Sequence, residues 1–186
     1  LADGHHHRER AAVIPMSQPG QAPVPPWPRP AVAWYALGIL VIAFIFSFVD
    51  RIILAMLVEP LKQDLGLTDT QLGVLQGLAF AVFYAAVGLP IGRLADRYGR
   101  RAIIGWGILL WSVMTAVCGL ARNFWELFLA RVGVGVGEAA LSPAAYSMIA
   151  DYFPREKLGR AIGVYQAGAF FGAGLSFLVG GLVIQA

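Results

Sequence analysis

Four ionisable residues fall inside long apolar segments, where a charge is costly and therefore informative. Asp50 and Arg51 lie in the first such segment, and Arg131 and Glu138 lie in the fourth. A charged side chain near the centre of a bilayer costs about 2.5–3.5 kcal/mol on insertion scales, so these groups are expected to face a cavity and to pair. Two arginines in such a place can serve as counter-charges for an anion, and a carboxylate can bind a proton.

Spacing along the segments predicts two depths for these residues. Asp50 and Arg51 precede the outer end of their segment, and Arg131 follows the outer end of the fourth, in each case by about seven residues, or ~10 Å at 1.5 Å per residue. Glu138 comes nearly two turns after Arg131, which predicts that both share one helix face and that Glu138 lies near the midplane. We predict that Glu138 is a proton site coupled to substrate binding, with the other three residues as its network. The alternative is a cluster of buried ion pairs that only stabilises the bundle.

The composition indicates an integral membrane protein. Of the 186 residues, 58% are hydrophobic and 13% are charged, whereas about 25% are charged in a soluble domain. Five apolar segments are each long enough to cross ~30 Å of hydrocarbon as a helix. We therefore predict an all-α polytopic membrane fold, with a disordered tail over residues 1–30 and helices at about 31–58, 71–91, 102–120, 124–152 and 161–184.

Two short basic segments predict the orientation of the chain. The decapeptide 92–101 carries four arginines against one aspartate, and residues 151–160 carry three basic residues against two acidic ones. The other two connections hold no such excess. Because cytoplasmic loops are enriched in Lys and Arg, we predict that 92–101 and 151–160 are cytoplasmic loops and that the N-terminus lies on the same side.

Small residues and one proline indicate how the helices pack. Glycines at four-residue spacing let helix backbones approach closely in lipid. Examples of such pairs are Gly73 with Gly77, Gly133 with Gly137, and Gly168 with Gly172. Pro143 lies inside the fourth segment, which predicts a kink there.

Several other functions lack the residues that they need. An intramembrane protease requires a serine–histidine pair or two aspartates, but no histidine follows His7 and Asp50 is the single clearly intramembrane aspartate. P-loops, dinucleotide fingerprints and Cys/His clusters are absent from the sequence, so we expect no enzyme, no metal and no cofactor. The net charge of +3 comes from arginines at helix ends rather than from one basic face, which argues against a nucleic-acid partner.

At this point the motifs resemble a family. The decapeptide reads Gly92-x-Leu94-Ala95-Asp96-Arg97-x-Gly99-Arg100-Arg101 and resembles the signature between the second and third helices of the major facilitator superfamily of transporters. Arg131 followed by Gly135 and Gly137 resembles the fourth-helix pattern of that superfamily. Residues 48–51, 131–139 and 149–153 resemble the spinster-type branch, which is associated with transport of sphingolipids, lysophospholipids or other amphiphilic anions.

The resemblance implies twelve helices in two halves, around a cavity that opens alternately to each side of the membrane. It implies that Asp50, Arg51, Arg131 and Glu138 occupy coupling and substrate positions. It also implies a cytoplasmic gate motif, in which two glycines permit a tight turn, an aspartate pairs near helix ends and arginines contact lipid phosphates and gate partners; these residues are Gly92, Asp96, Arg97, Gly99, Arg100 and Arg101. The chain would then be the N-terminal half truncated before helix six, and it would not transport without the C-terminal half.

We therefore expect a secondary active transporter, coupled to protons, that moves an amphiphilic or lipid-like anion by alternating access. Its expected place is the bacterial inner membrane, with membrane lipids around it and the N-terminus in the cytoplasm; Met16 is a plausible true start. The alternatives are a transporter of a small organic acid anion and a non-transporting membrane sensor or assembly subunit. A lipid-like substrate favours a laterally open aromatic cavity, for which the candidate residues are Phe44, Phe46, Phe80, Phe83, Tyr84, Phe170 and Phe171.

Overall fold

The computed structural model describes residues 27–185, apart from the side chains of Asp96 and of residues 183–185. The first 26 residues of the expected tail, Met16 included, therefore lie outside the described residues, and so does the side chain of Asp96. Within the described part all regular structure is helical, in the order α1 (Pro30–Met56), α2 (Val58–Leu65), α3 (Asp69–Gly73), the π-helical turn η1 (Val74–Leu78), α4 (Ala79–Tyr98), α5 (Arg100–Cys118), α6 (Phe124–Ala139), α7 (Leu141–Tyr152) and α8 (Arg155–Gln185).

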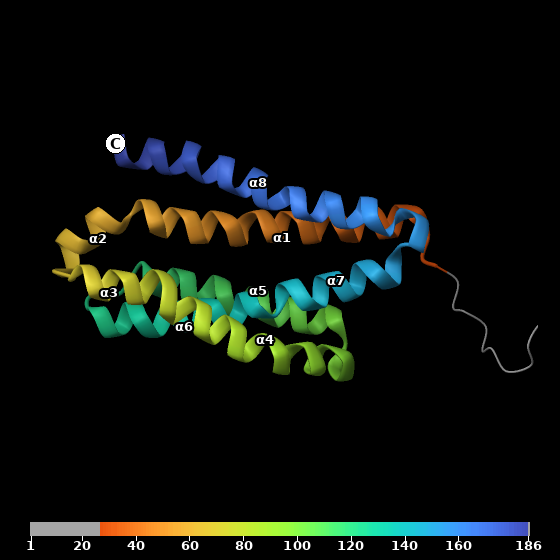
Figure 1. Ribbon diagram of the computed structural model, residues 1–186, viewed down its shortest axis with the longest axis horizontal. Coiled ribbons are helices and arrows are strands. Elements are labelled where there is room, and N and C mark those ends of the chain that lie inside the picture. The colour runs from red at the N-terminus through yellow and green to blue at the C-terminus, as the bar shows by residue number, and fades with distance from the viewer. Residues whose placement is uncertain (1–26, 186) are drawn as a thin grey trace, which may run out of the picture.

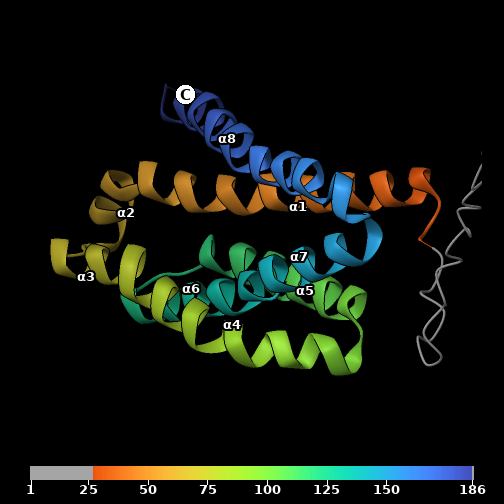
Figure 2. The ribbon, with the colours of Figure 1, turned by 45° about the vertical axis from the view of Figure 1, so that its right-hand side comes forward.

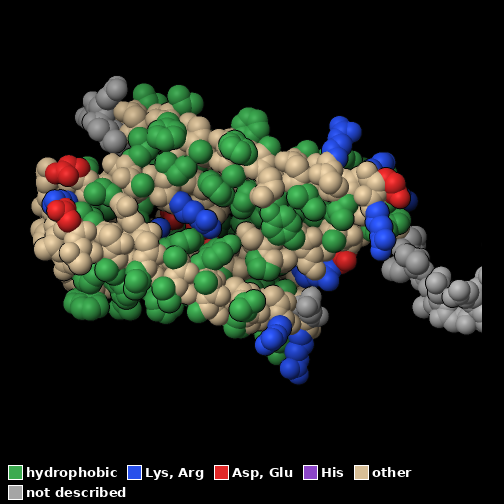
Figure 3. All heavy atoms as spheres, in the orientation of Figure 1, with side chains coloured by type: hydrophobic (Ala, Val, Ile, Leu, Met, Phe, Trp, Pro, Cys, Tyr) green, Lys and Arg blue, Asp and Glu red, His purple; other side chains and the backbone are tan. Residues whose placement is uncertain are grey.

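Five stretches of the described chain are long and apolar enough to cross a membrane, which agrees with the predicted all-α polytopic fold. They are Pro30–Met56, Asp69–Ala95, Arg100–Cys118, Phe124–Tyr152 and Arg155–Leu182. Hydrophobic side chains cover most of the middle of the face in Figure 3, whereas charged side chains gather mainly towards the two ends. This distribution is the one that a bilayer around the middle of the bundle requires.

The spans form two groups. In Figures 1 and 2, α1 and α8 run side by side, and α4, α5, α6 and α7 lie together beneath them. The first group is held by a close backbone approach, because a Cβ at Gly172 would lie 2.6 Å from the carbonyl oxygen of Ile45. In the second group, a Cβ at Gly137 would lie 2.6 Å from the backbone nitrogen of Trp111 on α5. Glycine is what permits both contacts.

The glycine pair Gly73 and Gly77 has different surroundings from the other two pairs. A Cβ at Gly73 or at Gly77 would meet nothing within 4 Å among the described residues. Both glycines flank or lie in η1, where the helix widens by one residue in a turn. This pair therefore does not bring two described helices together, unlike the pairs on α6 and α8.

The charged decapeptide is not a ten-residue loop, and that expectation is wrong. Helix α4 continues to Tyr98 and α5 begins at Arg100, so that Gly99 alone separates them. Gly99 has φ +90°, a conformation that residues with a side chain rarely adopt. Leu, Ala and Arg are strong helix formers, so a segment that is polar enough to leave the membrane still remains helical. Gly92 lies inside α4 and does not form the turn.

The fourth span is interrupted, as Pro143 leads one to expect. Helix α6 ends at Ala139, Ala140 forms a turn with φ −73° and ψ −27°, and α7 starts at Leu141. Pro143 has no N–H to donate to the carbonyl of residue 139, which weakens the helix at this point. The interruption at Ala140 comes two residues after Glu138, so Glu138 lies in the last turn of α6 before the bend.

Candidate functional site

The carboxylate of Glu138 on α6 is the centre of a buried polar cluster. Glu138 is 1% exposed, and its Oε2 accepts hydrogen bonds from the Oγ of Ser47 at 2.8 Å and from the Nε of Arg51 at 2.7 Å. The Nη2 of Arg51 also lies 2.6 Å from the same oxygen. The other oxygen, Oε1, is buried and has no hydrogen-bond partner among the described residues. All donors therefore meet one side of the carboxylate.

A second ion pair joins the same two helices. The Nη1 of Arg131 donates to the Oδ2 of Asp50 at 2.9 Å, and the Oγ1 of Thr115 on α5 donates to the Oδ1 of Asp50 at 3.2 Å. Arg131 is 4% exposed, and its Nε has no partner among the described residues. Removing one member of such a pair leaves the other as an uncompensated buried charge, which is strongly destabilising.

Helix geometry explains why these four residues form two pairs. Asp50 and Arg51 are consecutive on α1, so they point about 100° apart around that helix, because a turn holds 3.6 residues. Arg131 and Glu138 are two turns apart on α6 and share a face. One face of α6 therefore meets both α1 residues at different heights. The predicted pairing of intramembrane charges is present, whereas proton binding and coupling by these residues remain predictions.

Aromatic rings surround the guanidinium of Arg51. Its Cζ lies 4.6 Å from the ring centre of Phe80, 5.3 Å from that of Tyr84 and 5.5 Å from that of Phe48. The Arg51 side chain is 30% exposed. This is the largest exposed fraction among the four side chains of the two ion pairs. Arg51 is therefore the cation of the cluster that a ligand can reach.

The other candidate aromatic residues lie in different surroundings. Phe44 is buried and stacks on Tyr165, with ring centres 4.4 Å apart. Phe170 and Phe171 on α8 are largely exposed. Of the seven aromatic residues proposed to line a cavity, Phe80 and Tyr84 are the two that contact Arg51.

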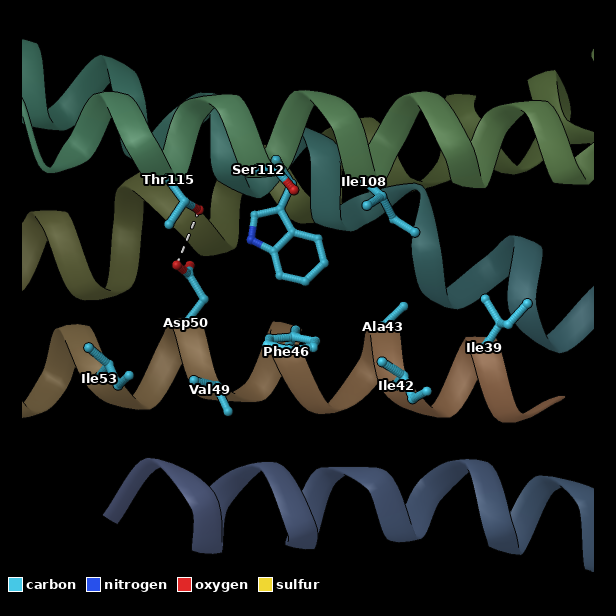
Figure 4. Close-up of a pocket in the computed structure, with 11 residues that line it drawn as sticks. Ile39, Ile42, Ala43, Phe46, Val49, Asp50, Ile53, Ile108, Ser112 and Thr115 are labelled. Carbon is cyan, nitrogen blue, oxygen red and sulfur yellow. Dashed lines mark hydrogen bonds between the residues drawn. The ribbon is translucent and has the colours of Figure 1, made fainter. Parts of the chain in front are cut away.

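A groove between α1 and α5 reaches Asp50 (Figure 4). Neither Arg51 nor Glu138 is among the residues that line it. It has a volume of ≈ 620 Å³. In Figure 4, Asp50 points from α1 across the groove to Thr115 on α5. Most of its lining is apolar: Ile39, Ile42, Ala43, Phe46, Val49, Ile53, Ile108 and Trp111, with Asp50, Ser112 and Thr115 as the polar members.

Sequence reasoning did not assign a role to Ser47, Thr115 or the ring of Phe80 at these ion pairs. Ser47 stands one turn before Arg51 on α1, and that spacing is a signal that it shares the face of Arg51. Thr115 and Phe80 carry no such signal, because a threonine or a phenylalanine in an apolar segment is equally consistent with a lipid-facing position.

The decapeptide residues lie far from the two ion pairs. Phe80, beside Arg51, precedes Gly99 by about nineteen helical residues, or ~28 Å at 1.5 Å per residue. Arg100 forms an ion pair with Asp151, and the Nε of Arg101 donates to the hydroxyl of Tyr152 at 3.0 Å. These contacts join the start of α5 to the end of α7. The Cζ of Arg97 lies 5.8 Å from the ring centre of Tyr98.

The two ion pairs are suited to binding protons and anions rather than to making or breaking covalent bonds. No group of His, Cys, Asp and Glu in the described part of the chain could hold a metal ion. What the cluster offers is a buried carboxylate with one free oxygen and a guanidinium that is partly exposed and bordered by aromatic rings. Such a cluster can take up a proton and can bind an anion.

Comparison with known proteins supports a common origin with membrane transporters. Residues 39–186 match the family model described as Major Facilitator Superfamily. An MFS-type efflux pump of Mycolicibacterium smegmatis is 36% identical over 156 residues, which cover 84% of this chain and 36% of the pump. The sphingosine-1-phosphate transporter SPNS2 of Xenopus tropicalis is 32% identical over 161 residues, which cover 86% of this chain and 31% of that protein.

A solved structure is similar in both sequence and fold. It is the inward-facing, unoccupied form of a bacterial homologue of the human lysosomal transporter Spinster, with a TM-score of 0.80 and 39% sequence identity. The match covers 83% of this chain and 32% of the homologue. This chain thus spans about a third of the length of the relatives that it matches.

Proposed function

The chain belongs to the Major Facilitator Superfamily, whose members are transporters and not enzymes, and we propose that the full-length protein containing it is a proton-coupled secondary transporter of an amphiphilic, lipid-like anion. Its structural neighbours include Spinster-like proteins. We further propose that it works by alternating access in the bacterial inner membrane, with its N-terminus in the cytoplasm. The basic residues at the α4–α5 and α7–α8 junctions support that orientation.

One observation carries the proposal: Arg51 shares its ion pair with a buried carboxylate while part of its side chain is exposed. When Glu138 takes up a proton, Arg51 loses its counter-charge, and an unpaired guanidinium in a membrane is costly. An anionic group of a substrate can then replace the carboxylate. Proton binding and anion binding would favour each other in this way, which is the linkage that coupled transport requires.

The surroundings of Arg51 support an amphiphilic substrate. Phe48, Phe80 and Tyr84 border the guanidinium, so a ligand with an anionic head would place its adjoining carbon chain against aromatic rings. Burial of apolar area contributes about 25 cal/mol per Å². A small organic acid would use the same arginine but would leave these rings uncovered. We therefore place the small organic acid second.

The substrate class can be measured directly. Thermal unfolding of the full-length protein should be followed in detergent with lysophosphatidic acid or with succinate as the added anion. We expect lysophosphatidic acid to raise the midpoint in a concentration-dependent way and succinate to leave it unchanged, because ligands that bind only the folded state stabilise it. Stabilisation by succinate alone would refute the lipid-like substrate and leave the organic acid transporter as the better assignment.

The coupling role of Glu138 can be tested with a matched pair of variants. In proteoliposomes, we expect Glu138→Gln to abolish lysophosphatidic acid uptake driven by a proton gradient, because the amide cannot exchange the proton. Exchange of lysophosphatidic acid without a gradient should persist, since the amide resembles the protonated acid. The control is Glu59→Gln on α2, where the exposed Glu59 accepts a hydrogen bond from Gln63. Undiminished proton-driven uptake in Glu138→Gln would contradict the coupling role.

The same vesicles distinguish transport from the third alternative. A membrane sensor or assembly subunit would bind its ligand without moving protons. We expect lysophosphatidic acid to cause proton movement that a pH-sensitive dye inside the vesicles reports. Binding without any such movement in the unsubstituted protein would favour the non-transporting subunit.

A further inference from the structure

One aromatic ring contacts both ion pairs. The ring centre of Phe80 lies 4.6 Å from the Cζ of Arg51 and 5.8 Å from the Cζ of Arg131. Among the described residues, Phe80 is the one whose ring lies within cation–π distance of both guanidiniums. The structure records no hydrogen bond between the Arg51–Glu138 pair and the Asp50–Arg131 pair in the described chain. The ring of Phe80 is therefore the contact that the two pairs share.

The position of this ring is fixed by α6. A Cβ at Gly135 would lie 3.2 Å from the carbonyl oxygen of Phe80 and 3.4 Å from its Cδ2. These distances are tight for a Cβ, so α4 lies directly against the face of α6 that carries Arg131 and Glu138. The ring of Phe80 also stacks on Tyr84, with the ring centres 5.4 Å apart.

The π-helical turn contributes to the same placement. Residues Val74–Leu78 form η1, and Phe80 is the second residue of the helix that follows it. A π-helical turn holds one residue more than an α-helical turn, which rotates everything after it relative to everything before it. The extra residue in η1 therefore contributes to the direction in which Phe80 points from its span.

We propose that Phe80 is a positioning residue, whose ring face contacts the guanidiniums of Arg51 and Arg131 and holds that of Arg51 where an incoming anion can reach it. The inference rests on the proposed function, because it assigns the ring a role in anion binding at Arg51. When Glu138 is neutral, Arg51 has lost its counter-charge, and the negative face of the ring still attracts it. The guanidinium then stays beside the ring, and the exposed part of the Arg51 side chain remains accessible to the anion.

The ring's charge distribution, rather than its bulk, is the property to vary. Mono-, di- and trifluorophenylalanine keep nearly the same shape as phenylalanine but remove negative charge from the ring face step by step. They should be placed at position 80 of the full-length protein, beside Phe80→Tyr, which keeps the ring face, and Phe80→Leu, which keeps only the bulk. The whole set should be repeated with Arg51→Gln, in which the closer of the two cations is gone.

Two readouts separate this inference from the proposed function. Without ligand, we expect the thermal midpoint to fall stepwise with fluorination, by about 2–4 °C over the series, and to be nearly unchanged by it in Arg51→Gln. The affinity for lysophosphatidic acid should fall stepwise by about tenfold in total and be retained in Phe80→Tyr.

Each other outcome has a definite meaning. A midpoint and an affinity that both ignore fluorination would show that Phe80 acts only by packing, and would overturn the inference even if Phe80→Leu fails to fold. The proposed function would then be decided by its own tests, which are the thermal shift, the uptake by Glu138→Gln and the proton movement. A stepwise midpoint without any binding of lysophosphatidic acid would keep the contact with the arginines, overturn its role in anion binding and refute the proposed substrate.

Discussion

Arg131→Leu is expected to destabilise the chain by about 3–5 kcal/mol, because it leaves the carboxylate of Asp50 without its cation in a buried place. The Nη1 of Arg131 and the Oδ2 of Asp50 are 2.9 Å apart, and Arg131 is almost fully buried. Thr115 would remain as the hydrogen-bond donor to Asp50, but a hydroxyl does not neutralise a charge. Thermal or denaturant unfolding in lipid nanodiscs measures the loss.

The double variant Asp50→Asn with Arg131→Leu tests the cause. Removing both charges together should recover most of the stability, since replacing a whole buried ion pair by uncharged groups is often nearly neutral. Arg122→Leu serves as the control for loss of an arginine, because Arg122 is exposed and precedes α6. A double variant no more stable than Arg131→Leu would show that the arginine stabilises the bundle by packing and not by charge.

The four charged residues could be predicted from sequence because their cost in hydrocarbon makes them conspicuous. Their partners could not be. Whether Asp50 or Arg51 faces Glu138 depends on the rotation of α1 about its own axis, and apolar segments carry little signal for that rotation when lipid and core are equally apolar. The partner of Glu138 is Arg51, and that of Asp50 is Arg131.

The decapeptide shows a different limit. Its charges predict a segment outside the hydrocarbon, but they say nothing of whether the backbone is helical there. The helix propensities of Leu94, Ala95 and Arg97 favour α4, and only the positive φ of Gly99 ends it. Charge and backbone conformation are thus separate properties, and the charges of the motif indicate one of them only.

Glycine pairs with the same spacing also have different surroundings. Gly73 and Gly77 have the same four-residue spacing as Gly133 and Gly137, yet a Cβ at either of the first two meets nothing within 4 Å in the described chain. Spacing shows that two glycines share a helix face. It does not show whether another helix lies against that face, which depends on the arrangement of all the spans.

This difference predicts the second large effect, at Gly137. A Cβ there would lie 2.6 Å from the backbone nitrogen of Trp111 and 2.8 Å from the carbonyl oxygen of Gly107. Both are backbone atoms and cannot turn aside as a flexible side chain would, so α5 and α6 must separate. We expect Gly137→Leu to cost about 3 kcal/mol or more, which is at or beyond the upper end for overpacking a core. Unfolding in nanodiscs measures it.

Gly73→Ala is the matched control, because that glycine faces open space among the described residues. Alanine favours a helix over glycine by about 1 kcal/mol, so this variant should be as stable as the unsubstituted chain or slightly more stable. A separation of α5 and α6 would also move Glu138, the next residue on α6, away from Ser47 and Arg51. Gly137→Leu should therefore lose anion binding in the full-length protein even under conditions where it remains folded. Equal stability of the two glycine variants would show that the α5–α6 contact is looser than these distances imply.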